Sequence, residues 1–277
     1  MYKSWLITGA SSGLGRKLTE KVLHNGDRVY ATVRKAGGLD DLQQQFGDRL
    51  NVLLMDVTDT DALRRAVNQA FSQARRIDVV VSNAGYGLFG AAEELNDEQI
   101  TRQVATNLTG SIQLIRAVIP YLRNQGGGRI VQLSSEGGQI AYPNFSLYHA
   151  TKWGIEGFIE SVALEVEDFG IDFVIVEPGP TRTHFASNLD YASPLACYEN
   201  TVSGAMRQAL ESGRFEINGD MDKTVAIMLD VVEQPHPPLR LPLGSTAYTH
   251  IHQALTTRLA ALEALHAIAC AADITPD

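Results

Sequence analysis

Residues 4–15 read SWLITGASSGLG, an apolar run that leads directly into a loop with three glycines. The run 4–8 has the character of a short buried strand, and a helical pattern begins near residue 14. Glycine permits a tight turn and lets the backbone approach a phosphate closely, and the N–H groups at the start of the next helix can bind a pyrophosphate. The stretch therefore predicts a dinucleotide-binding loop, although Gly9, Gly13 and Gly15 do not follow the G-x-G-x-x-G spacing.

The chain continues this alternation of short strands and longer helices. Strands are expected at 4–8, 28–33, 51–55, 78–82, 129–134 and 172–177, and helices at 14–25, 39–46, 59–74, 97–123 and 147–169. The strands are nearly continuous apolar runs, as in parallel sheets that are buried on both faces. The order predicts an α/β fold, a doubly wound parallel sheet of the Rossmann type with right-handed crossovers.

The sequence pattern changes after residue 177. The segment 181–222 carries scattered aromatic residues and no strand signal, so we expect a loop that closes over a substrate. A helix over 222–234 and an edge strand over 239–244 should follow. One domain, 1–277, is thus expected, with its core at 3–185 and 222–246.

The tail from 247 to 272 is an Ala/Leu-rich helical pattern. Apolar residues recur along one of its sides at Ile251, Leu255, Leu259, Leu262, Leu265 and Ala269. A stripe of this kind is typical of a helix that packs on its own domain or on a partner subunit. We expect one of these two arrangements.

The composition is that of an ordinary globular protein, 44% hydrophobic and 20% charged, with a net charge of −9 over 277 residues. No basic block stands out, which argues against nucleic acid or an anionic membrane as a partner. Cys197 and Cys270 are far apart and have no metal-like spacing, which indicates a reducing compartment. The N-terminus enters a strand almost at once, without the apolar core of a signal peptide. We expect a cytoplasmic protein.

Arg34 follows the strand 28–33, where dinucleotide folds place the adenosine ribose. An acidic residue there binds the 2′-hydroxyl of NAD, whereas a basic residue pairs with the 2′-phosphate of NADP. Arg34 supplies a base, no acid opposes it, and Ser11, Ser12 and Lys35 could add phosphate contacts. The sequence predicts a preference for NADP(H), with NAD(H) as the other option. Alternatively, Arg34 is only a solvated residue at a strand end.

Residues 148–158 read YHATKWGIEGF, in a stretch with a helical pattern. Tyr148 and Lys152 should project from the same face, one turn apart. Taken alone, the pair could be a core tyrosine beside a lysine that extends past it to solvent.

Five motifs occur in order: TGASSGLG (8–15), SNAG (82–85), the pair Ser134-Ser135, YHATK (148–152) and EPGPTRT (177–183). In this order they resemble the motifs of the classical short-chain dehydrogenase/reductase family, over residues 3–185. The C-terminal extension more loosely resembles the hydroxysteroid- and retinol-dehydrogenase-like branch. The resemblance implies an NADP(H)-dependent oxidoreductase that interconverts a hydrophobic alcohol and its ketone or aldehyde. Ser82 stands where many members have asparagine.

The resemblance implies catalytic roles for Asn107, Ser135, Tyr148 and Lys152. Tyr148 would be the general acid and base, because the ammonium of Lys152 favours phenolate and lowers the pKa of the phenol. Ser135 would bind the substrate oxygen, and Asn107 would hold a water that links Lys152 to solvent. No metal is required. The expected cofactor contacts are Gly9, Ser11, Ser12, Gly13, Leu14, Gly15, Arg34, Asp56, Val57, Asn83, Ala84, Gly85, Tyr148, Lys152, Pro178, Gly179, Thr181 and Thr183.

The substrate contacts are expected where the strands end, at the carboxyl edge of the sheet. Besides Ser135, the candidates are Tyr86, Gln139, Tyr142, Phe145, His184, Phe185, Leu189 and Tyr191. Their apolar character predicts a hydrophobic small molecule, although each could also be a core residue.

Two other functional classes remain open. A catalytically inactive dinucleotide-binding sensor or scaffold should lack the tyrosine or the lysine, and this chain has both. An extended-type epimerase or dehydratase tends toward another glycine spacing and a larger substrate domain. The long helices 97–123 and 147–169 are apolar on more than one side. They predict a homo-oligomer, a dimer or a tetramer.

Overall fold

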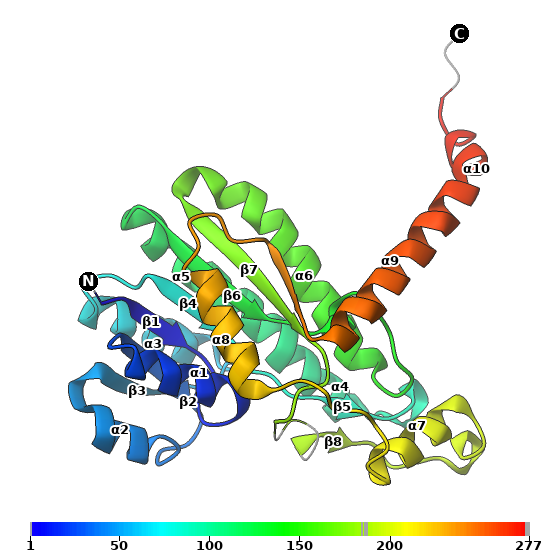
Figure 1. The fold of residues 1–277 in the computed structure, drawn as a ribbon, viewed down its shortest axis with the longest axis horizontal. Helices are drawn as coiled ribbons and strands as arrows, with labels where there is room; N and C mark the ends of the chain where they lie inside the picture. The colour runs from blue at the N-terminus through cyan, green and yellow to red at the C-terminus, as the bar shows by residue number, and fades with distance from the viewer. Residues whose placement is uncertain (1, 184, 186–187, 275–277) are drawn as a thin grey trace.

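The computed structural model describes residues 2–183, 185 and 188–274. Its centre is a seven-stranded sheet in the order β3-β2-β1-β4-β6-β7-β9, in which all neighbours pair in parallel (Figure 1). The strands are β1 (Ser4–Ile7), β2 (Arg28–Val33), β3 (Leu50–Leu54), β4 (Val79–Ser82), β6 (Gly128–Leu133), β7 (Ile171–Pro178) and β9 (Arg240–Leu243). The chain reverses its direction of winding between β1 and β4, where open α/β sheets bind ligands. The predicted doubly wound sheet is confirmed.

Successive side chains of a strand point to opposite faces of the sheet, and on most strands apolar side chains are buried on both faces. Helices therefore cover both faces. On one face pack α1 (Gly13–His24), α2 (Asp40–Phe46) and α8 (Met221–Val232). On the other face pack α3 (Thr60–Gln73), α5 (Gly110–Asn124) and α6 (Ser146–Val166), and α4 (Asp97–Val104) precedes α5. Two apolar core layers result, one on each side of the sheet.

The helix predicted over 97–123 is interrupted. A π-helical turn, Ala105–Thr109, separates α4 from α5. Such turns insert a residue into the helix and often occur at functional sites. Asn107, a predicted catalytic residue, lies in this turn.

The segment 181–222 is not the irregular loop that we predicted. A short strand, β8 (Asp190–Tyr191), pairs with β5 (Leu88–Phe89), and a helix, α7, spans Val202–Glu211. Two residues of strand are too few for a periodic signal. The helix was missed because it contains Ser203 and Gly204, which have weak helix propensity, and because these two are its buried residues, so it carries no buried apolar stripe.

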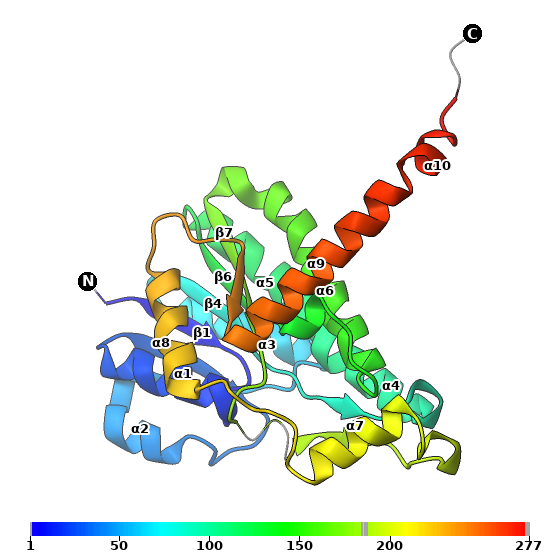
Figure 2. The same cartoon turned by 45° about the vertical axis from the view of Figure 1, so that its right-hand side comes forward.

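The C-terminal helices α9 (Ser245–Ala264) and α10 (His266–Cys270) extend away from the sheet (Figures 1 and 2). The apolar packing of α9 on the body lies in its first turns, where Ala247 and Ile251 are buried with Ile140, and farther out Arg258 lies over the Trp153 ring of α6. Farther out, Leu255, Leu259, Leu262 and Leu265 are 48–65% exposed. The expected apolar packing on the domain is therefore confined to the start of the helix. Within the described chain, no helix is long and apolar enough to span a membrane.

Candidate active site

Tyr148 and Lys152 lie in the first two turns of α6, across the carboxyl end of β6. The phenol and the ammonium are both buried, and the Lys152 Nζ atom lies 5.6 Å from the centroid of the Tyr148 ring. The ammonium also donates a hydrogen bond of 2.8 Å to the carbonyl oxygen of Leu133, the last residue of β6. The predicted same-face arrangement is present, and it is fixed to the strand end.

Ser135 follows β6 directly and faces the same place. Its hydroxyl accepts a 3.1 Å hydrogen bond from the Gly137 N–H and so caps the 3₁₀ turn Glu136–Gly138. The same hydroxyl lies near the Tyr148 phenol and lowers the pKa of that phenol. Ser135, Tyr148 and Lys152 therefore converge, as the sequence predicted.

His149 holds the loop after Ser135 against α6. Its Nε2 atom accepts from the Tyr142 N–H at 2.9 Å, so its Nδ1 carries the hydrogen that binds the Gly137 carbonyl oxygen at 2.8 Å. Burial lowers the pKa of this imidazole, which matches the neutral form that these two contacts require. Sequence reasoning did not single out this residue, because its partners are backbone atoms.

Burial controls the electrostatics of the pair. It raises the pKa of Tyr148 to about 12, and the charges of Glu136 and Glu156 raise it too, while Ser135 lowers it. Burial also lowers the pKa of Lys152 to about 8, and the Glu156 carboxylate opposes that decrease. The expectation that Lys152 lowers the pKa of Tyr148 is therefore wrong for the protein alone, because the cost of desolvating a phenolate is larger.

Asn107 is almost fully buried and clamps the backbone of Tyr86. Its Oδ1 accepts from the Tyr86 N–H at 3.1 Å, and its Nδ2 donates to the Tyr86 carbonyl oxygen at 2.8 Å. The Nδ2 atom also reaches the Thr151 hydroxyl at 3.5 Å. The π-helical turn thus brings Asn107 between the segment after β4 and α6. Its predicted role in holding a water stays a prediction.

The glycine loop has the backbone that a phosphate site needs. Gly9 and Gly13 have φ angles of +66° and +55°, which only glycine adopts easily, and a Cβ on Gly9 would lie 2.8 Å from the Cα of Ala84. Asn83 secures the loop, because its Nδ2 donates to the carbonyl oxygens of Thr8 and Gly9 at 2.9 and 3.1 Å.

The start of α1 is open to an anion. Ser12, its N-cap residue, makes no side-chain capping bond in the described structure, and the first turn contains no acidic residue. The first N–H groups of a helix have no partner within the helix. Together with the positive end of the helix dipole they fit a pyrophosphate group. These residues therefore fit a dinucleotide cofactor.

The other predicted cofactor contacts lie at the ends of neighbouring strands. Arg34 is exposed after β2, and Asp56 follows β3, where its carboxylate accepts from the Thr58 N–H and hydroxyl at 2.9 and 2.7 Å. After β7, the Gly179 N–H donates to the Leu243 carbonyl oxygen, and Thr181 caps this turn. The remaining members of the predicted set lie at the same edge of the sheet: Ser11, Val57, Ala84, Gly85 and Thr183 in loops, Leu14 and Gly15 in the first turn of α1, and Pro178 at the end of β7.

Only part of the predicted substrate set gathers at the phenol. The rings of Phe185 and Phe145 lie 5.6 and 6.0 Å from that of Tyr148, centroid to centroid. Gln139 instead donates to Glu177 at 2.8 Å, and the Tyr86 hydroxyl accepts from Arg102 at 3.3 Å. Leu189 is buried and Tyr191 is half exposed beside Phe89. His184 is outside the described residues.

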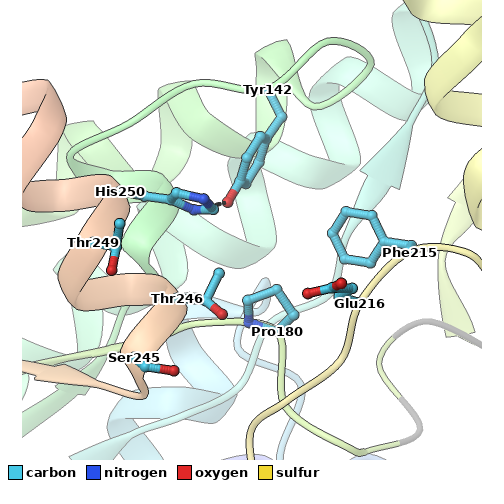
Figure 3. Close-up of a pocket in the computed structure, with 8 residues that line it drawn as sticks. All are labelled: Tyr142, Pro180, Phe215, Glu216, Ser245, Thr246, Thr249 and His250. Carbon is cyan, nitrogen blue, oxygen red and sulfur yellow. Dashed lines mark hydrogen bonds between the residues drawn. The ribbon is translucent and has the colours of Figure 1, made fainter.

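Tyr142 lines a cavity of about 340 Å³ that opens between the turn after β7 and α9 (Figure 3). Its hydroxyl hydrogen-bonds Glu136 and lies 2.9 Å from the Nδ1 atom of His250 on α9. The other lining residues are Pro180, Phe215, Glu216, Ser245, Thr246 and Thr249. Sequence reasoning named only Tyr142 among the lining residues, and it missed Ser245, Thr246, Thr249 and His250 because α9 lies about 100 residues later in the chain and carries no local motif.

Comparison with known proteins places this arrangement in a family. A family model described as short chain dehydrogenase matches residues 3–193. Oxidoreductase BOA17 from Botryotinia fuckeliana is 39% identical over 256 residues, which cover 92% of this chain and 93% of that protein. A 3-ketodihydrosphingosine reductase from Bacteroides thetaiotaomicron is 34% identical over 240 residues, 86% and 87% of the two chains.

A solved structure agrees with these sequence matches. A short-chain dehydrogenase from Streptomyces avermitilis has a TM-score of 0.91 and 34% identity, over 99% of this chain and 100% of that one. The chain therefore belongs to the short-chain dehydrogenase/reductase family, as its motifs indicated. It is an oxidoreductase that acts on CH–OH groups with a nicotinamide dinucleotide.

We still predict that the segment 181–222 closes over the substrate, although it is more structured than expected. Phe185 already lies against the Tyr148 ring, and Asp190 is tied to Arg102 of α4 by an ion pair. We expect amide protection of residues 189–222 to increase when cofactor and substrate bind, because closure excludes water from the site. Hydrogen exchange with and without ligands measures this, with α3 as an internal reference. Full protection of the segment without ligands would contradict closure.

Proposed function

We propose that this protein is an NADP(H)-dependent oxidoreductase that interconverts a hydrophobic secondary alcohol and its ketone, or a primary alcohol and its aldehyde. Tyr148 is the general acid and base in this proposal. The convergence of Tyr148, Lys152 and Ser135 at the end of β6 is the observation that carries it. The glycine loop and the uncapped start of α1, at the same edge of the sheet, support a dinucleotide beside them.

Each residue has a distinct task. The Ser135 hydroxyl donates to the substrate oxygen and stabilises negative charge that develops on it. The Tyr148 hydroxyl gives its proton to that oxygen in reduction and takes it back in oxidation. Lys152 keeps a positive charge beside the phenol and so stabilises the phenolate left after proton transfer. A bound nicotinamide supplies or accepts the hydride.

The walls of the site favour a hydrophobic substrate that also carries polar groups. Phe145 and Phe185 provide aromatic surface at Tyr148, whereas His250 and Thr249 add polar atoms in the cavity at Tyr142. The relative from Bacteroides thetaiotaomicron is named a 3-ketodihydrosphingosine reductase. We infer that long-chain ketones with hydroxyl or amino groups are the best first substrates to assay.

Replacement of Tyr148 by phenylalanine is expected to reduce kcat at least about 1,000-fold, while the Kd of cofactor changes little. The phenol supplies the transferred proton, and general acid–base catalysis of this kind contributes about 10²–10⁴-fold. Tyr121→Phe is the matched control, because its hydroxyl donates to Asn68 on the surface, far in the fold from Tyr148. Turnover is followed by the absorbance of reduced cofactor, and cofactor binding by calorimetry.

Two outcomes of that assay would change the proposal. Near-normal turnover by the Tyr148→Phe variant would remove Tyr148 from the mechanism. Cofactor binding by the unchanged protein without turnover on a broad panel of ketones and alcohols would favour the alternative, a catalytically inactive dinucleotide-binding sensor or scaffold.

The preference for NADP(H) should depend on Arg34. Its exposed side chain follows β2, where a basic residue pairs with the 2′-phosphate. We expect Arg34→Asp to lower the ratio of kcat/KM for NADPH over NADH at least about tenfold. Arg28→Asp, at the opposite end of the same strand, is the control and should leave the ratio unchanged. A native enzyme that uses NADH better would show that Arg34 is only a surface residue.

We also propose that the protein forms a homo-oligomer, most simply a dimer, in the cytoplasm. Trp153 and Leu164 on α6 are 44% and 78% exposed, and the outer leucines of α9 add to the apolar surface. Exposed apolar patches of this kind mark association sites. Light scattering at micromolar concentration should give at least twice the mass of one chain, and a strict monomer would contradict the proposal.

The exposed, unpaired Cys197 and Cys270 fit a reducing compartment.

A further inference from the structure

A buried carboxylate lies behind the proposed catalytic pair and has no role in the steps above. Glu156 is on α6, one helical turn after Lys152 and two turns after Tyr148, so all three share a face. The residue is 1% exposed. Burial of a carboxylate is costly unless it is paired and hydrogen-bonded, so its partners indicate what it does.

Both carboxylate oxygens of Glu156 are held by side chains from other elements. The Ser134 hydroxyl donates to Oε1, and the Arg240 guanidinium donates to Oε2 at 2.7 Å. Ser134 is the immediate neighbour of Ser135, and Arg240 begins β9. The carboxylate therefore ties the serine segment to the helix that carries Tyr148 and Lys152.

The loop after Ser135 passes directly over this carboxylate. A Cβ on Gly138 would lie 1.7 Å from Oε1 of Glu156, so only glycine fits there while the glutamate keeps its place. Arg240 extends the contact to the end of β7, because it also binds Glu177, which precedes the turn at Pro178 and Gly179. Three segments of the site thus meet at the ion pair between the buried Glu156 carboxylate and the partly exposed Arg240 guanidinium.

We propose that Glu156 is a positioning residue for the reaction. Its carboxylate, fixed by Ser134 and Arg240, keeps Lys152 charged beside Tyr148 and holds the loop that carries Ser135. The inference rests on the proposed function, since it assigns to Glu156 an effect on the proposed catalytic pair.

The charges around Glu156 support this direction. Lys152 lies one turn earlier on the same helix and interacts with Glu156 through its charge. Arg240 binds it from β9, while Glu177 on β7 and Glu160 on α6 contact the same guanidinium. The Glu156 carboxylate raises the pKa of Lys152 against the effect of burial, and it also raises the pKa of Tyr148. Removal of its charge should therefore lower the pKa values of both groups.

The test is Glu156→Gln, which removes the charge and keeps the shape. The Lys152 ε-carbon is observed by nuclear magnetic resonance in protein labelled with ¹³C-lysine, and its signal is assigned by its loss in Lys152→Met. We expect the midpoint of its titration, near pH 8 in the unchanged protein, to fall by about one pH unit, the size of effect that a nearby opposite charge has. The alkaline limb of kcat/KM should move to lower pH by a similar amount.

Two further variants separate charge from general stability. Glu160→Gln is the matched control, because this exposed residue binds Arg240 at 2.8 Å from the solvent side, and it should leave the midpoint unchanged. Glu156→Asp keeps the charge and should restore most of the native midpoint. If Glu156→Gln does not fold, Gly138→Ala serves in its place, since the added methyl group displaces the carboxylate and should also lower the midpoint.

An unchanged Lys152 midpoint in Glu156→Gln, or in Gly138→Ala where the first variant fails to fold, would overturn the inference. So would an equal shift in Glu160→Gln. Because the titration needs neither substrate nor turnover, its failure is distinct from a failure of the proposed function, which appears as an inactive unchanged protein.

Discussion

The close seating of α6 against the end of β6 is the contact on which the site depends. A helix that crosses a parallel sheet at this edge brings its first turns beside the strand ends. Here Lys152 binds the Leu133 carbonyl oxygen at the end of β6, and two further hydrogen-bonded side chains of α6 fix the distance. His149 binds the backbone of the loop after Ser135, and Glu156 binds Ser134 from one side and Arg240 from the other. The loop can approach so closely only because Gly138 has no side chain. Small changes in this seating would separate the serine from the phenol.

Burial sets the chemistry of the site as much as its geometry does. Tyr148 and Lys152 both sit where charge is costly, so the protein alone favours the neutral phenol and weakens the proton affinity of the ammonium. Such a pair responds strongly to any charge placed near it, because a low local dielectric strengthens each interaction. The buried carboxylates of Glu136 and Glu156 act in this way, because their charges raise the pKa of Tyr148.

Sequence patterns predicted the sheet and most of its helices, since these rest on local periodicity, and the motifs at the strand ends named Ser135, Tyr148 and Lys152, which the structure brings together. They failed where the local signal is weak or where the contact is distant in the sequence. β8 is two residues long and α7 contains Gly204, so both signals are weak. His250 reaches Tyr142 from a helix about 100 residues later. They also misjudged the pKa of Tyr148, because spacing shows that a lysine is near but not how deeply both groups are buried. Arg240 and Glu156 belong to the same class of contacts, which only the fold brings together.

The contacts of α9 separate its cavity end from its outer end. Ile251, its last buried residue, is adjacent to His250 in the cavity wall. Two turns later the Arg258 guanidinium lies 5.0 Å from the centroid of the Trp153 ring on α6. At 1.5 Å per residue, Ala264 lies roughly 9 Å beyond Arg258. A change in the direction of the outer turns therefore acts on the contact between Arg258 and Trp153 before it reaches the polar wall around Tyr142.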